Sequence, residues 1–232
     1  MKALRVAAIL VTTALAPAVL PSAAHAGAVI GPILPYFGLA QSPFNGLSFS
    51  YFHLETFEEG ALTAPGVTAS AGAVGTGPLY DSVEGPGPLG HDLFSANGAA
   101  GITFTFDKSV LGSLPTDVGI VWTDGDGPDR TFKAFDENNS LIGTIVDSTP
   151  KFFSSGGDDD PANYRFFGAT NAGGISSIFI ANDNGGIEVD DLQYGLQASG
   201  GSPVPEPATL SIFGLGLAGL ALTRRRKGTG PS

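Results

Sequence analysis

Apolar and polar residues alternate through much of the middle of the chain. In residues 102–106, Ile102, Phe104 and Phe106 fall on one side of an extended segment, and two threonines fall on the other. A period of two is typical of strands that bury one face. Further runs of this kind cover residues 49–57, 118–122, 131–134, 141–146, 164–169, 175–181 and 187–194. The pattern therefore predicts about eight short strands.

Short clusters of Gly, Asp, Asn and Pro separate these runs, for example at residues 124–128, 171–174 and 182–186. Closely spaced turns between short strands indicate an all-β fold. We expect an antiparallel β-sandwich or jelly roll over residues 49–196. No internal repeat of fixed period is present, which disfavours a solenoid or a propeller.

The segments beside this domain have a different composition. Residues 27–48 are rich in Gly and Pro with scattered aromatic residues, which predicts a loosely docked N-terminal arm. Residues 60–90 are rich in Gly, Pro and Ala and predict a long loop region with a short strand near Val67. Residues 197–203 are expected to be a linker.

The N-terminus has the three parts of a secretory signal peptide. Lys2 and Arg5 give a positive start, and residues 6–20 are apolar. Ala24 and Ala26 then supply the small residues of a cleavage site. We expect residues 1–26 to be removed, with Gly27 as the mature N-terminus.

The C-terminus carries a short motif, an apolar run and a basic cluster. Residues 208–223 have no charge over sixteen positions, and Arg224 to Lys227 are all basic. As a helix this run would be about 24 Å long, slightly short of a hydrocarbon core of about 30 Å. Flanking residues and local thinning can make up the difference. We expect a transmembrane helix over residues 208–223 with the basic stop, residues 224–227, on the cytoplasmic side.

The order Pro-Glu-Pro, apolar helix and arginine cluster resembles the PEP-CTERM sorting signal of Gram-negative bacteria, over residues 204–227. The resemblance implies export across the inner membrane by the export machinery, transient anchoring there, and processing by an exosortase, a membrane-embedded cysteine transpeptidase. It further implies delivery to the cell surface or extracellular matrix of a host that makes an exopolysaccharide. The residues that carry the motif are Val204, Pro205, Glu206, Pro207, Arg224, Arg225 and Arg226.

Charge and cysteine content narrow the classes of function. Between residues 27 and 203 there are 21 Asp and Glu but only five Lys and Arg, a net charge of −16. Such a surface repels phosphates, which argues against nucleic-acid binding. The chain has no cysteine, so disulfides, thiolate zinc sites and cysteine nucleophiles are excluded.

Acidic residues suggest two candidate Ca²⁺ sites. The β pattern resembles the jelly-roll domains of carbohydrate-binding modules, through residues 55–60 (ETFEEG) and 186–194 (GIEVDDLQY). That resemblance implies one structural Ca²⁺ shared by Glu58 and Asp190, with Glu55 as an alternative to Glu58. Two carboxylates on neighbouring strand ends repel unless a cation or solvent exposure relieves the repulsion, so ordinary exposed carboxylates are the alternative.

A second group, Asp124, Asp126 and Asp129, occupies a Gly-rich turn. Its spacing does not fit an EF-hand, which needs Gly at position 6 and Glu at position 12. A Ca²⁺ loop of another kind and a solvated turn both remain open.

The chain contains no Gly-x-Ser-x-Gly, His-Glu-x-x-His or P-loop motif. Trp122, the one tryptophan, shares an alternating face with Val118 and Ile120, which favours core packing over sugar stacking. We therefore expect a non-catalytic structural or glycan-binding protein of the extracellular matrix. The alternatives are a hydrolase that acts on matrix polysaccharide, and an adhesive or surface-layer protein without a ligand site.

Overall fold

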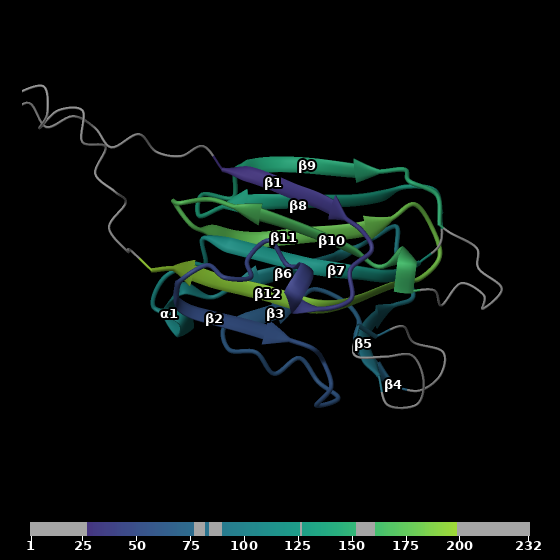
Figure 1. Cartoon of the computed structure of the whole chain (residues 1–232), viewed down its shortest axis with the longest axis horizontal. Helices are drawn as coiled ribbons and strands as arrows, with labels where there is room; N and C mark the ends of the chain where they lie inside the picture. Colours follow the sequence, from purple (N-terminus) through teal and green to yellow (C-terminus); the bar gives the residue numbers. More distant parts are fainter. Residues whose placement is uncertain (1–26, 77–81, 84–89, 126, 152–160, 199–232) are drawn as a thin grey trace, which may run out of the picture.

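The computed structural model describes residues 27–76, 82–83, 90–125, 127–151 and 161–198 of the 232-residue chain. These residues form two antiparallel sheets (Figure 1). Sheet A contains β1 (Ala28–Ile33), β2 (Phe49–Glu55), β4 (Ala73–Thr76), β5 (His91–Ser95), β7 (Asp117–Gly125), β10 (Arg165–Thr170) and β12 (Ile187–Gln197). Sheet B contains β3 (Val67–Ala69), β6 (Ile102–Phe106), β8 (Arg130–Asp136), β9 (Leu141–Asp147) and β11 (Ile175–Asn182).

Helical structure among the described residues is confined to three short pieces, α1 (Lys108–Leu111), η1 (Leu39–Gln41) and η2 (Pro161–Asn163). The prediction of an all-β sandwich is confirmed. In sheet A the strand order is β1-β10-β7-β12-β5-β4, with β2 also paired to β12, and in sheet B it is β3-β6-β11-β8-β9.

The main core lies between the two sheets and follows the period-two pattern. On β6, Ile102 and Phe104 are completely buried and Phe106 nearly so, while Thr105 is exposed. Trp122, also completely buried, belongs to the same cluster, which confirms its expected core position. Apolar side chains from both sheets fill this layer because each strand turns every second residue inward.

A second apolar cluster covers the outer face of sheet A. Tyr36 stacks on Phe166 at a centroid distance of 5.6 Å, and Phe44 packs edge-on against the same ring. Val121 and Tyr164 complete the buried members of this cluster. β7 is therefore buried on both faces, although its sequence alternates only in part.

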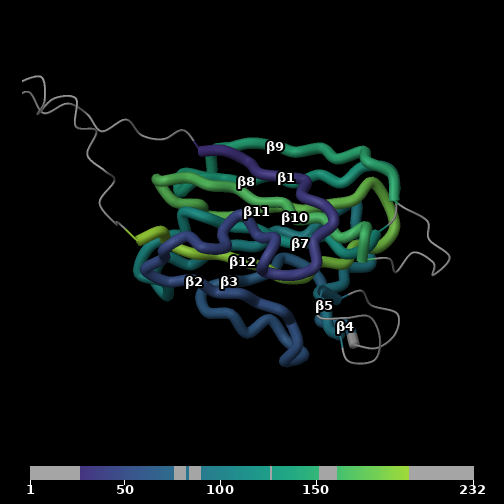
Figure 2. Tube along the Cα trace, viewed as in Figure 1, coloured from purple at the N-terminus to yellow at the C-terminus, as the bar shows by residue number. Residues whose placement is uncertain are grey.

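Residues 34–48 lie across sheet A and connect its edge strand β1 to β2 (Figure 2). The Tyr36 N–H donates to the Tyr164 carbonyl at 3.0 Å, and the Ser42 hydroxyl donates to Gln193 Oε1 at 2.6 Å. This segment and β1 are integral parts of the domain. The prediction of a loosely docked arm at residues 27–48 is therefore wrong, because Tyr36 and Phe44 of this segment are buried in the second cluster.

Strands β1, β4 and β5 were not predicted from the pattern. β1 contains Pro32, which removes a hydrogen-bond donor and is tolerated at a sheet edge. β5 buries neighbouring residues, including Asp92 and Leu93, so its sequence has no regular alternation. β1 pairs with β10, and β5 pairs with three residues of β12. Both partners lie far away in the sequence, so no local pattern reveals these pairings.

Strand β12 organises sheet A. One of its sides pairs with β7 along most of its length. Its other side pairs with β5 at residues 187–189 and with β2 at residues 192–197. Asp190 and Asp191 lie at the junction between these two partners, and a register shift against β7 marks a bulge there. Asp191 has a φ of 45°, in the left-handed region that few residues other than glycine adopt.

Candidate functional site

Acidic residues of β12, of β5 and of the loop after β2 lie near the bulge of β12. Asp190 follows Val189, which pairs with Leu93, so Asp92 of β5 is its neighbour across the strands. Glu58 lies three residues beyond the end of β2, the other strand that meets β12 here. Asp92, Asp190 and Asp191 are buried, and the Glu58 side chain is 28% exposed. We call this group the bulge cluster.

Glu58 and Asp190 hold the same short segment, residues 82–83. The Val83 N–H donates to Asp190 Oδ2 at 2.8 Å, and the Ser82 hydroxyl donates to Glu58 Oε1 at 3.3 Å. Glu58 also accepts a hydrogen bond from the His91 N–H at 2.8 Å, and its Oε2 lies 3.1 Å from His91 Nδ1. The two residues that the sequence proposed as Ca²⁺ ligands thus both accept hydrogen bonds from the segment 82–83.

Glu55, the alternative ligand, accepts hydrogen bonds with both of its carboxylate oxygens from the loop that follows β2. Its Oε1 accepts from the Phe57 N–H, and its Oε2 accepts from the N–H groups of Thr63 and Ala64 and from the Thr63 hydroxyl. The side chain is 2% exposed. These hydrogen bonds fix the loop that follows β2, so Glu55 has a structural role at the base of that loop.

The two described members of the predicted Asp124, Asp126 and Asp129 group have different partners. Asp124 forms an ion pair with Lys151, while Asp129 accepts a hydrogen bond from the Ser148 hydroxyl. Asp126 lies outside the described residues. Among the residues that the structure describes, no group of three or more His, Asp and Glu side chains has the arrangement of a metal site.

A buried cluster of charges surrounds Trp122. Arg130 and Arg165 place their guanidinium carbons 4.9 and 5.2 Å from the centre of its ring, and Lys151 Nζ lies at 5.4 Å. Asp147 Oδ2 lies 3.0 Å from Arg130 Nε and 3.2 Å from Arg165 Nε. The Trp122 indole N–H donates to Asn182 Oδ1 at 2.7 Å.

The protonation of this cluster follows from burial and charge. Burial alone would raise the pKa of Asp147, but hydrogen bonds from Thr149 and the charges of Arg130 and Arg165 bring it below its usual value. Burial and the nearby Arg130 lower the pKa of Arg165 to about 10, and Asp147 opposes that shift. Asp147 is thus the shared anion of two buried guanidinium groups beside Trp122.

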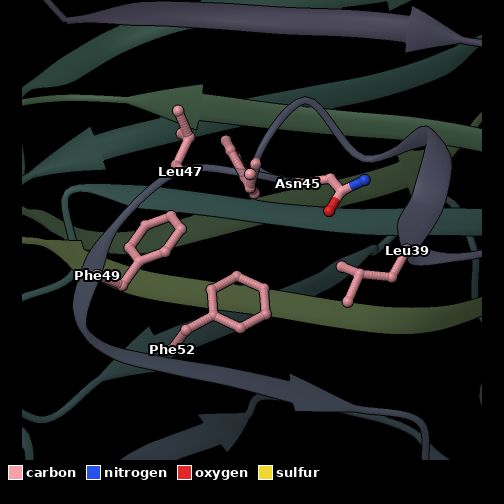
Figure 3. A pocket seen from close by; sticks show the side chains of 7 residues that line it. Leu39, Asn45, Leu47, Phe49 and Phe52 are labelled. Atoms are coloured by element: carbon pink, nitrogen blue, oxygen red, sulfur yellow. The ribbon is translucent and has the colours of Figure 1, made fainter.

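An apolar groove of about 320 Å³ lies on the outer side of sheet A. Figure 3 shows the side chains of Leu39, Leu47, Phe49 and Phe52 around one hollow. These residues come from η1, from the connection to β2 and from β2 itself. Phe49 and Phe52 are in contact, with ring centroids 5.0 Å apart.

The outer face of sheet B carries a row of hydroxyl, aromatic and basic side chains. Cross-strand pairing aligns Thr103 with Phe179, Phe179 with Lys133, and Lys133 with Thr144. Lys133 Nζ lies 5.5 Å from the centre of the Phe179 ring. Thr144 is exposed, and the other three side chains are half-buried. We call these four residues the sheet B row.

The processing residues named from the sequence lie almost entirely outside the described part of the chain. This applies to Ala24 and Ala26 and to all seven residues of the C-terminal motif. Gly27 is the first described residue, and β1 begins at the next one. Within the described ranges no helix is long and apolar enough to cross a membrane, and the expected helix at 208–223 lies outside them.

Solved structures with a distant likeness to the chain include the following three. The K1 cleaved adhesin domain of Lys-gingipain from Porphyromonas gingivalis is 12% identical, with a TM-score of 0.44 over 64% of this chain and 100% of that domain. The C-terminal family 22 carbohydrate-binding module of Clostridium thermocellum Xyn10B is 12% identical, with a TM-score of 0.35 over 67% of this chain and 98% of that module. The enzymatically active domain of bacteriophage CBA120 tailspike protein 4 is 12% identical, with a TM-score of 0.33 over 61% of this chain and 20% of that chain.

These structural likenesses are too distant to bear on function, and no curated protein matches the chain. The family comparison is specific for the C-terminus, where residues 203–227 match the PEP-CTERM protein-sorting motif. The resemblance seen in the sequence is thereby confirmed. The chain therefore carries the sorting motif of a secreted protein that is anchored in the membrane before processing by an exosortase.

Proposed function

We propose that the chain is a non-catalytic protein of the extracellular matrix that associates with exopolysaccharide as a structural or glycan-binding component. The sorting motif is the observation that carries this proposal. It begins at residue 203, six residues after β12 ends at Gln197. A single β-sandwich domain is thus the part that export delivers to the outside of the cell.

The sheet B row gives this proposal a specific surface. Neighbouring strands are about 4.8 Å apart, so the row offers one side chain at each such step across the sheet. The CH face of a sugar can pack on an aromatic ring such as Phe179, and hydroxyl groups can bond to the sugar hydroxyls. The Lys133 ammonium adds hydrogen-bond donors for sugar hydroxyls.

Co-sedimentation with the producer's own exopolysaccharide tests this function. We expect the domain to co-sediment, and we expect Phe179→Ala and Lys133→Gln to weaken retention several-fold because they remove the stacking surface and the ammonium donors. Leu54→Ala, on sheet A, is the matched control and should bind normally. Thermal melting of each variant separates lost binding from lost folding.

Two results would contradict the proposal. The wild-type domain could fail to co-sediment, which would remove the glycan association. Alternatively, the domain could release reducing ends from the polysaccharide, which would favour the hydrolase.

We further propose that the bulge cluster holds a structural Ca²⁺ through Glu58 and Asp190. Both carboxylates accept hydrogen bonds from the same two-residue segment, Glu58 from the Ser82 hydroxyl and Asp190 from the Val83 N–H, and this shared segment supports the proposal. Ca²⁺ takes six to eight oxygen ligands, and backbone carbonyls can complete such a set. Asp190 and its neighbour Asp191 are both buried, and a bound cation would offset the cost of burying their negative charges.

Thermal melting in saturating Ca²⁺ and in EDTA tests this site. A cation that binds only the native state must raise the melting temperature. We expect Glu58→Gln and Asp190→Asn to abolish the difference, and the exposed neighbour Glu59→Gln to keep it. Equal melting temperatures of the wild type in the two buffers would contradict the proposal.

A further inference from the structure

The first part of the mature domain is free of charge. Residues 27–54 contain no Asp, Glu, Lys or Arg, and Glu55 is the first charged residue of the domain. The domain as a whole carries 21 acidic residues between positions 27 and 203. This uncharged stretch includes β1, the segment across the outer face of sheet A, and nearly all of β2.

Apolar side chains are exposed on the same stretch. Seven large hydrophobic residues are exposed in the described part of the chain, and four of them lie here. These four are Phe37 (54% exposed), Leu39 (38%), Leu47 (44%) and Leu54 (36%). The groove of Figure 3 lies among them and includes Leu39 and Leu47 in its lining. We call the surface formed by residues 37–54 the uncharged face.

The chain leaves the domain beside this face. Gln197 pairs with Phe49, and the Ala198 N–H donates to the Ser48 carbonyl at 2.9 Å. Nine residues, 199–207, then precede the apolar run that starts at residue 208. Nine extended residues span at most about 30 Å. The start of the apolar run is therefore limited to about that distance from Ala198, the residue that pairs beside this face.

We propose that the uncharged face rests on the lipid bilayer while the unprocessed chain is anchored by residues 208–223. The inference depends on the membrane anchoring that belongs to the proposed function. A short tether gives the bilayer a high effective concentration at this face, so modest apolar contacts are enough. The acidic surface elsewhere on the domain has no such attraction to lipid, which selects this face over the others.

Site-specific fluorescence on the full chain tests the orientation. The protein has no cysteine, so Leu47→Cys and Val146→Cys each accept one polarity-sensitive dye without further changes. Val146, on sheet B, is 58% exposed and serves as the matched control. The labelled chains are reconstituted in phosphatidylcholine vesicles, with and without brominated acyl chains.

We expect the dye at position 47 to shift to shorter wavelength and to be quenched several-fold more by brominated lipid than the dye at position 146. Leu39→Ser in the Leu47→Cys background should reduce that quenching. Equal quenching at both positions would overturn the proposal. A blue shift at position 47 that persists without vesicles would also overturn it, and would indicate that a second copy or the chain's own tail fills the groove.

A third dye position distinguishes failure of the membrane anchoring from failure of the docking of the uncharged face. Ser211→Cys places the dye inside the apolar run. Quenching at position 211 but not at position 47 would overturn only the docking of the face. No quenching at position 211 would contradict the membrane anchoring itself, and the docking would fall with it.

Discussion

Asp147 is the carboxylate on which the buried charge cluster depends. It is 4% exposed and lies within 3.2 Å of the Nε atoms of Arg130 and Arg165. Asp147→Asn would leave two buried arginines without their shared anion. We expect a loss of about 3–5 kcal/mol in the free energy of unfolding, measured by denaturant titration at neutral pH.

The pH dependence of this effect has a definite sign. Because the folded pKa of Asp147 is below the usual value of 3.8, its contribution is complete above that value and is lost as the pH falls through the folded pKa. The difference in the free energy of unfolding between the wild type and Asp147→Asn should therefore become smaller at acidic pH. Glu137→Gln, at a half-exposed carboxylate, is the control and should change stability little. Equal stability of Asp147→Asn and wild type would contradict the network.

For single residues, the sequence predicted whether a side chain is buried better than it predicted which side chains contact it. The alternation of Val118, Ile120 and Trp122 was enough to place the tryptophan in the core. The charges around it come from β8, β10 and the end of β9, and no local pattern links those positions. Glu58 and Asp190 were paired through a resemblance to known domains, and the structure adds Asp92 and the segment 82–83 beside them.

The connection between β1 and β2 behaves as a structural element although it has little regular structure. Phe44 is 3% exposed and contacts Phe166, whereas Phe37 on the same connection is 54% exposed. We expect Phe44→Ala to cost about 3–5 kcal/mol of unfolding free energy, because it removes a buried ring and leaves a cavity. Phe37→Ala should cost far less, and comparable losses in denaturant titrations of the two variants would contradict the described packing.

Strand prediction succeeded where one face is buried and the other is open. On β6 and β8 the pattern has a period of two, and both strands form as expected. The pattern is weaker where a strand is short. β5 is an example, because it buries neighbouring residues and contributes only a short pairing to β12. β7 was expected at residues 118–122 although the segment over sheet A buries its second face, because Val118, Ile120 and Trp122 still alternate.

The first and last strands of the described domain place its two ends on the same side. Figure 1 shows the start of β1 and the end of β12 at the same end of the sandwich. The two signals expected from the sequence therefore attach on one side of the domain, close to the uncharged face. Their removal would leave a compact acidic domain and would take away six of the eleven Lys and Arg residues.

The intact mass of the protein recovered from the extracellular matrix tests the central claim most directly. We predict a chain that begins at Gly27 and lacks residues 208–232, and we predict that Glu206→Ala leaves an uncleaved precursor in the membrane fraction. A matrix protein that retains residues 208–232, or a Glu206→Ala variant that matures like the wild type, would contradict the account.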